Sequence, residues 1–324
     1  MSTNAILYVD TFTQPYPSPA VQNQYADWLT DLNGSGFTTA ILYNLHIDPV
    51  GNLRYTNAQT PLIADGKLQK GYEYLPELLA SLTQGSFGSV LFCLGGWGSE
   101  GDYVNCGNLF ARYGTGTGNP VVRNLVALQA MGISGIDIDL EVGAGNYASL
   151  QYAYFQPIVA QLTSFLAYEL HLDVTYCPYE APQFWLDCMA CGYAQFGAQP
   201  VSWLNLQCYD GGSGNTQSQW AGYITAYDKA ANSPNSTSLG PLGISTPAAF
   251  VIPGYGSAGE YGSSPAAVQS DFSDSSKMAA GVTGGFIYTY AGILYDQQHG
   301  TYAPNNTTAD YASAIIDGID ALQG

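Results

Sequence analysis

The stretch Gly135-Ile136-Asp137-Ile138-Asp139-Leu140-Glu141 decides the fold of this chain. Carboxylates occupy every second position from Asp137 to Glu141, and aliphatic side chains fill the positions between them. Alternate residues of a β-strand point to opposite faces, so Asp137, Asp139 and Glu141 are expected to share one face. Acidic residues are poor strand formers, and like charges along one face repel one another. The pattern therefore favours a functional site over the alternative, an ordinary solvated strand face.

The composition limits the classes of partner. The chain has 324 residues, 46% of them hydrophobic, with 38 glycines and 17 prolines, which suits a globular protein of α/β-barrel size. Acidic residues number 25 and basic residues 7, for a formal net charge of −18. Nucleic acids and anionic membranes carry the same sign, so neither is an expected partner. The 26 tyrosines offer rings and hydroxyls that suit a neutral sugar.

No metal or cofactor is expected. His46, His171 and His299 share no ligand spacing, and no glycine-rich phosphate loop follows a strand. Cys188 and Cys191 have CxxC spacing, but no second pair completes a zinc site, and the six cysteines do not read as a disulfide scaffold. No apolar run is long enough to span a membrane, and the first residues lack the features of a signal peptide.

Eight apolar runs of strand length alternate with eight segments of helical periodicity. The expected strands are residues 5–10, 38–47, 89–96, 135–141, 172–179, 203–210, 248–255 and 284–291. The expected helices are residues 19–32, 72–82, 121–131, 148–170, 184–193, 219–231, 265–280 and 308–322. This alternation predicts an α/β fold, a single (βα)8 TIM barrel over residues 1–324 without an accessory binding module. A doubly wound open sheet is the alternative, but eight units of similar spacing favour closure. Residues 98–118 are expected to be a loop.

The active site of such a barrel lies at the carboxyl ends of the strands. Glu141 ends the fourth expected strand, so it reaches furthest toward the mouth, with Asp139 below it and Asp137 deeper. Burial beside two other carboxylates raises the pKa of a carboxyl group, which makes Glu141 a candidate general acid. The candidate substrate-binding residues on other strands are Tyr8, Trp97, Gln207, Asp210, Tyr288 and Tyr290.

Residues 134–141 resemble the D-G-x-D-x-D-x-E signature of glycoside hydrolase family 18, the chitinase-like (βα)8 barrels. Residues 93–97 are similar to the family's S-x-G-G motif on strand three, and residues 207–210 to its M-x-Y-[DN] motif on strand six. Residues 284–288 resemble the glycine-rich start of strand eight. The resemblance in layout covers nearly the whole chain, whereas the resemblance in residue identity is confined to these motifs.

The resemblance implies hydrolysis of β-1,4-linked N-acetylglucosamine by a substrate-assisted retaining mechanism. Glu141 would protonate the glycosidic oxygen while the substrate's acetamido carbonyl attacks the anomeric carbon to form an oxazolinium ion. Asp139 would hold the acetamide N–H, with Asp137 beneath it. Tyr209 would donate to the acetamide oxygen, and Asp210 would bind that group or sugar hydroxyls. Chitin, chito-oligosaccharides and the N-glycan core are all compatible substrates; they favour an extracellular location, although a cytoplasmic one fits the sequence as well.

Three positions depart from the family pattern. Ser134 stands for the first Asp of the signature, and Cys93 for the Ser of S-x-G-G. The family's tryptophan beneath the sugar falls on Thr289 if the glycines are aligned, or on a Tyr if the register slips by one residue. Its loss would remove roughly 1–3 kcal/mol of stacking, by analogy with bases on aromatic rings. The rings that could replace it are those of Trp97, Trp185, Tyr288 and Tyr290.

Two other function classes remain as alternatives. One is a catalytically silent carbohydrate-binding or inhibitor protein on the same barrel, since a fold does not fix a function. Such relatives usually lose the acid or its Asp partner, whereas Glu141 and Asp139 are both present here. The other is a barrel enzyme of unrelated chemistry.

Overall fold

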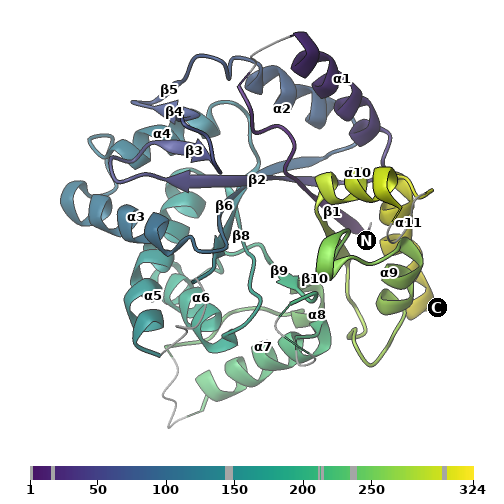
Figure 1. Ribbon diagram of the computed structural model, residues 1–324. Helices are drawn as coiled ribbons and strands as arrows, with labels where there is room; N and C mark the ends of the chain where they lie inside the picture. The colour runs from purple at the N-terminus through teal and green to yellow at the C-terminus, as the bar shows by residue number, and fades with distance from the viewer. Residues whose placement is uncertain are drawn as a thin grey trace.

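The computed structural model describes residues 3–15, 19–142, 149–210, 212, 215–233, 239–300 and 305–324. Its core is a closed barrel of eight parallel strands surrounded by helices (Figure 1). The ring runs β1-β2-β6-β7-β8-β9-β10-β11 and closes because β1 pairs in parallel with both β2 and β11. The expected parallel barrel is therefore confirmed, and the open sheet is excluded.

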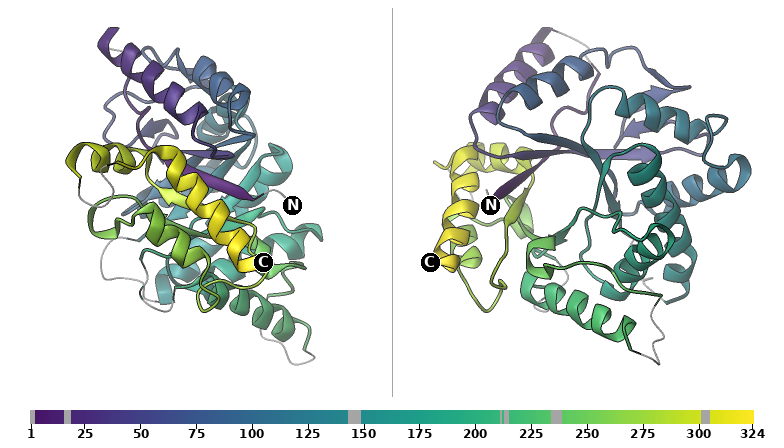
Figure 2. Two further views of the ribbon diagram at one scale, coloured as in Figure 1. Left: turned by 90° about the vertical axis from the view of Figure 1, so that its right-hand side faces the viewer. Right: turned by 180° about the vertical axis from the view of Figure 1, so that it is seen from behind.

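Each expected strand and helix is present, and all but one lie within a few residues of their expected bounds. The exception is the helix expected over residues 265–280, which ends at Phe272. The barrel strands are β1 (Asn4–Val9), β2 (Thr39–Ile47), β6 (Ser89–Gly96), β7 (Gly135–Leu140), β8 (Asp173–Tyr176), β9 (Trp203–Gln207), β10 (Val251–Gly256) and β11 (Gly284–Tyr288). The expected helices are α1 (Pro19–Asn33), α2 (Leu75–Gln84), α4 (Pro120–Gln129), α5 (Ser149–Ser164) with the π-helical turn η1 (Phe165–Glu169), α6 (Pro182–Phe196), α7 (Gln217–Ala231), α9 (Pro265–Phe272) and α11 (Thr308–Gln323). In Figure 2, α11 lies beside α9 and close to β1, so the last helix covers the first strand.

The barrel has two separate apolar layers. One lies between the strands and the surrounding helices. The other fills the inside of the barrel and consists of Ile6, Tyr8, Ile41, Leu91, Cys93, Cys177, Ile252 and Phe286. Strands buried on both faces read as continuous apolar runs, which is why their periodicity alone could not assign an inner face. The carboxylates of β7 are the exception that marks its inner face.

The expectation of a loop over residues 98–118 is wrong, because Glu100–Tyr113 form helix α3. Tyr103, Cys106 and Phe110 lie on its buried stripe, but glycines and asparagines between them weaken the helical signal. Gly107 allows a close approach to α5, since a Cβ there would lie 2.6 Å from Cδ1 of Ile158. Tertiary packing therefore forms a helix that local propensity does not predict.

Further elements were not expected from the sequence. The antiparallel strands β3 (Leu53–Tyr55), β4 (Ile63–Ala64) and β5 (Lys67–Leu68) extend the sheet from β2. Three short helical segments, α8 (Pro247–Phe250), η2 (Gly259–Tyr261) and α10 (Tyr290–His299), flank the last two barrel strands. The eighth strand ends earlier than expected because the hydroxyl of Thr289 caps α10 by accepting from the N–H of Gly292.

The structure also bears on disulfide bonds and on membrane-spanning helices. All six cysteines are free, in agreement with the expectation that they form no disulfide scaffold. Within the described residues, no helix combines the length and the apolar character needed to cross a membrane.

Candidate active site

The two carboxylates of β7 and Glu141, which follows it, lie inside the barrel at increasing height. Asp137 is fully buried, Asp139 is nearly so, and Glu141, directly after the strand, is half-buried. Ser99 fixes the end of the strand, since its Oγ donates to the carbonyl of Asp139 at 3.1 Å and its N–H donates to the carbonyl of Glu141 at 3.0 Å. The alternation of the sequence therefore becomes a ladder of acids that rises toward the barrel mouth.

Asp137 anchors the base of this ladder. Its carboxyl group accepts hydrogen bonds from Tyr8 Oη at 2.7 Å, Thr175 Oγ1 at 2.5 Å and Asn205 Nδ2 at 2.9 Å. Burial raises the pKa of Asp137, and these donors act against the rise. A carboxyl group with three protein donors is held in one position.

Asp139 and Glu141 form a coupled pair. Burial raises the pKa of Asp139 well above its usual value, and the charges of Glu141 and Asp137 raise it further. Burial also raises the pKa of Glu141. Gln207 Nε2 donates to Glu141 Oε1 at 3.0 Å and lies 3.4 Å from Asp139 Oδ1. Two such carboxyls hold a proton at a pH where isolated ones are ionised, which is what a general acid requires.

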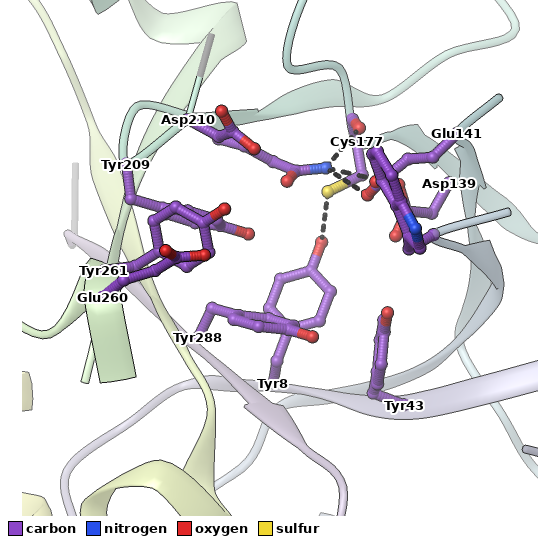
Figure 3. A pocket seen from close by; sticks show the side chains of 12 residues that line it. Tyr8, Tyr43, Asp139, Glu141, Cys177, Tyr209, Asp210, Glu260, Tyr261 and Tyr288 are labelled. Carbon is purple, nitrogen blue, oxygen red and sulfur yellow. Dashed lines mark hydrogen bonds between the residues drawn. The ribbon is translucent and has the colours of Figure 1, made fainter. Parts of the chain in front are cut away.

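The pair opens into a cavity of about 350 Å³, at the small end of the range for ligand sites. Its lining residues are Tyr8, Tyr43, Trp97, Asp139, Glu141, Cys177, Gln207, Tyr209, Asp210, Glu260, Tyr261 and Tyr288. In Figure 3, Asp139 and Glu141 lie on one side of it, and Tyr209, Tyr261 and Glu260 lie on the other. A ligand in the cavity would contact the carboxyl groups of Asp139 and Glu141 on one side, and tyrosine hydroxyls together with the Glu260 carboxyl group on the other.

The tyrosines form an aromatic wall. The rings of Tyr209 and Tyr288 stack at 5.6 Å with an interplanar angle of 17°, and Tyr43 meets Tyr288 edge to face at 5.4 Å. Tyr261 packs against Tyr209 at 5.5 Å. Burial raises the pKa of Tyr209 well above its usual value, so its hydroxyl remains protonated and can donate to a ligand oxygen.

Nine of the ten predicted site residues lie together here: eight line the cavity, and Asp137 lies directly beneath it. Tyr290 does not join them, because it begins α10, is fully buried and donates its hydroxyl to Asp31 Oδ2 at 2.9 Å. Trp185 is also excluded, since it is buried on α6 against Tyr176. Of the four candidate replacements for the missing tryptophan, only Trp97 and Tyr288 therefore reach the cavity.

Sequence reasoning missed four lining residues. Tyr43 belongs to β2 and Cys177 directly follows β8, and both were hidden within apolar runs. Glu260 and Tyr261 come from η2, a segment without a local motif. The period of two along β2 could have identified Tyr43, because Ile41, two residues before it, faces the barrel interior. No comparable signal points to Glu260.

The residues that depart from the family motifs each have an identified contact. Cys93 lies in the barrel interior with Sγ 3.8 Å from Asp139 Oδ2, and Ser134 Oγ accepts from the N–H of Val90 at 3.2 Å. Thr289 donates to Asp10 Oδ2 at 2.9 Å. In the described part of the chain, no group of three or more His, Cys, Asp and Glu side chains is arranged to hold a metal ion.

Comparisons with known proteins show the fold. No protein-family model and no curated protein sequence matches the chain. The structure is similar to a class V chitinase from Nicotiana tobaccum, with a TM-score of 0.55, 10% identity and coverage of 97% of this chain and 99% of that one. It is similar to the GH18 chitinase ChiB from Flavobacterium johnsoniae, with a TM-score of 0.52, 10% identity and coverage of 97% and 94%.

A third similar structure contains a sugar. It is a mutant plant class V chitinase from Cycas revoluta in complex with (GlcNAc)3, with a TM-score of 0.53, 13% identity and coverage of 96% of this chain and 98% of that one. These likenesses extend over nearly the full length of each chain. The chain therefore has the fold of the chitinases of glycoside hydrolase family 18.

Proposed function

We propose that this protein is a glycoside hydrolase of the chitinase type, which cleaves β-1,4-linked N-acetylglucosamine. The observation that carries the proposal is the coupled pair Asp139 and Glu141 at the edge of a cavity walled by tyrosines. The resemblance of residues 134–141 to the family signature and the chitinase fold support the same assignment. A protein that merely held a sugar would not need a proton-holding carboxyl pair there.

The proposed reaction is retaining and substrate-assisted. Glu141 protonates the glycosidic oxygen, and the acetamido carbonyl of the substrate attacks the anomeric carbon. Asp139 holds the acetamide N–H and stabilises the positive charge of the oxazolinium intermediate, while Tyr209 donates to the acetamide oxygen. Water then attacks the intermediate as Glu141 removes its proton. The charge of Asp137 raises the pKa of Asp139, so Asp137 tunes the proton of Asp139 from beneath.

The proposed substrate is an oligo- or polysaccharide that contains N-acetylglucosamine. Asp210 and Gln207 supply polar contacts, and Trp97 and Tyr288 supply rings at the cavity wall. Trp97 is 61% exposed, so its ring is available to a sugar outside the cavity. The wall suits a chain that lies across the barrel mouth.

A substrate comparison tests this proposal. The protein is incubated with N-acetylglucosamine hexamer and, separately, with a high-mannose glycoprotein, and the products are separated by chromatography. Shorter oligomers from the first support a chitinase, and release of the glycan from the second supports an endoglycosidase. Binding of the hexamer without cleavage would instead identify a silent sugar-binding protein.

The pH dependence of hydrolysis should report the carboxyl pair. The charge of Asp210 adds to the effect of burial in raising the pKa of Glu141. Activity needs protonated Glu141, so it is lost as pH rises through the pKa of the pair. Asp210→Asn removes one raising charge, and the alkaline limb of kcat/KM should therefore move to lower pH.

The matched control for this shift is Glu180→Gln. Glu180 has a raised pKa of its own, whereas the charge that raises the pKa of Glu141 is that of Asp210. The alkaline limb of kcat/KM in Glu180→Gln should coincide with that of the wild type. A limb that stays in place in Asp210→Asn, or moves equally in both variants, contradicts the assignment of Glu141 as the acid.

A further inference from the structure

A hydrogen-bonded chain runs from the surface to the wall of the cavity. Asp102 Oδ2 lies 2.7 Å from His46 Nδ1, and His46 Nε2 lies 2.7 Å from Thr56 Oγ1. Thr56 Oγ1 donates to Asn44 Oδ1, and Asn44 Nδ2 donates to the carbonyl oxygen of Gly95. Asp102 belongs to α3, and Thr56 follows β3, so two of the elements that the sequence did not predict contribute to its outer part.

The end of this chain is close to the proposed catalytic groups. Gly95 is paired with Asp139 across β6 and β7, and Trp97 of the cavity wall follows two residues later. A Cβ at Gly96 would lie 2.5 Å from Oη of Tyr43 and 2.7 Å from Nδ2 of Asn44. Gly96 has a φ of 105°, which favours glycine. The Asn44 amide is therefore packed directly against the segment that carries Trp97.

The donors and acceptors fix the protons along the chain. The carbonyl of Gly95 needs a donor, so the amide nitrogen of Asn44 faces it and the amide oxygen faces Thr56. The single hydroxyl proton of Thr56 is then used on Asn44, and Thr56 must accept from His46 Nε2. At the other ring nitrogen, Asp102 already accepts the N–H of Ile47 at 3.1 Å through Oδ1. An ionised carboxylate only accepts, so His46 Nδ1 donates as well.

A histidine that donates from both nitrogens is an imidazolium. Moving a proton from the ring to Asp102 would avoid the charge, but carboxylic acids are much stronger acids than imidazolium. Two further charged residues lie nearby on β2 and β3 or directly after them: Arg54, opposite His46 in the pairing of β2 with β3, and Asp48, which binds Arg54 at 3.1 Å. Those two charges offset each other, which leaves Asp102 as the partner of His46.

We propose that His46 is a positioning residue: its protonated ring holds the chain Asp102–His46–Thr56–Asn44–Gly95 and thereby fixes the Trp97 wall of the cavity. Loss of one ring proton reverses the Thr56 hydroxyl toward His46. The amide oxygen of Asn44, a residue that is 5% exposed, then loses its Thr56 donor. A buried polar group without a partner is costly, so Asn44 shifts and the segment from Gly95 to Trp97 loses its support. The consequence for substrate binding rests on the proposed function; the coupling itself does not.

Nuclear magnetic resonance tests the coupling without any assay of activity. The protein has three histidines and five tryptophans. The ring signals of His46 and the indole signal of Trp97 are therefore assigned by their absence from the spectra of His46→Gln and Trp97→Phe. Both ring nitrogens of His46 should be protonated in ¹⁵N spectra while the hydrogen-bonded chain is intact. When one of these nitrogens loses its proton as pH rises, the indole signal of Trp97 should shift together with the His46 ring signals. A Trp97 signal that does not follow the His46 ring signals overturns the proposal.

Two variants test whether the coupling between His46 and Trp97 passes through the hydrogen-bonded chain. In Thr56→Val, His46 should still titrate, but the Trp97 signal should no longer follow it. In Arg54→Gln, which removes a neighbouring charge outside the chain, the Trp97 signal should still follow His46. If Trp97 follows His46 in Thr56→Val as well, the coupling does not pass through Thr56 and the proposal is wrong.

Steady-state kinetics tests the consequence for substrate. At a pH where the ¹⁵N spectra show both ring nitrogens of His46 protonated, Thr56→Val should raise KM for the N-acetylglucosamine hexamer roughly two- to tenfold, the loss expected for one hydrogen bond. The value of kcat should change less than KM, because the carboxyl pair is untouched. An equal fall in kcat with unchanged KM contradicts a binding-wall role. If the hexamer is not cleaved at all, the proposed function fails, whereas the NMR result still decides the coupling.

Discussion

Glu141→Gln should abolish hydrolysis of N-acetylglucosamine oligomers, with kcat reduced on the order of 10³-fold, within the range for loss of a general acid. The amide is nearly isosteric with the carboxyl group and can still accept from Gln207 Nε2, which lies 3.0 Å from Glu141 Oε1. What it cannot do is deliver a proton to the leaving oxygen. The measurement is kcat and KM on the hexamer, with the melting temperature compared to the wild type.

The matched control is Glu260→Gln, which makes the same chemical change on the other side of the same cavity (Figure 3). It should retain kcat within a few-fold, because Glu260 is an exposed residue of η2 far from the carboxyl pair in that view. Unchanged turnover in Glu141→Gln would remove Glu141 from the acid role. Equal losses in both variants would show that the cavity, rather than the proton, had been disturbed.

Asp139→Asn is expected to have the second-largest effect, a fall in kcat of about 10²–10³-fold, comparable to loss of one preorganised electrostatic contact. The positive charge of the oxazolinium ion develops next to Asp139, and an amide cannot balance it. The hexamer should still bind, since the side chain keeps its shape and an acceptor oxygen. The measurement pairs single-turnover rates with calorimetric binding.

Asp10→Asn provides the control for this change. Asp10 is another carboxylate at the same end of the barrel, where it accepts from Thr289 Oγ1 at 2.9 Å and from the N–H of Ala291 at 3.0 Å. Neither contact touches the cavity, so turnover should persist. If Asp139→Asn turns over hexamer at the wild-type rate, the acetamide is not the nucleophile and the substrate-assisted scheme is wrong.

The sequence predicts much of this molecule because its signals are local. Strands of a parallel barrel are continuous apolar runs, and their helices have a clear period, so the order of elements follows directly. The alternating acids of the fourth strand also indicate which of its faces points into the barrel, which a continuous apolar strand does not show. The position of that strand as the fourth of eight then places Glu141 at the mouth.

The remainder depends on contacts between distant residues. Helix α3 forms because Gly107 allows it to pack on Ile158 of α5, and no local pattern encodes that approach. Glu260 reaches the cavity from a turn after β10, whose place is set by the barrel. Tyr290 was expected in the site, but the cap at Thr289 starts a helix and turns it into the core. These features are set by tertiary contacts, which cannot be read from individual positions in the sequence.

The most direct measurement of the central claim is the anomeric configuration of the first product. The wild-type protein is mixed with N-acetylglucosamine pentamer, and proton NMR follows the new reducing ends before they mutarotate. A retaining, substrate-assisted hydrolase releases the β-anomer first, and that is the expected result. Release of the α-anomer first, or a pentamer that is bound and remains uncut, would contradict the account.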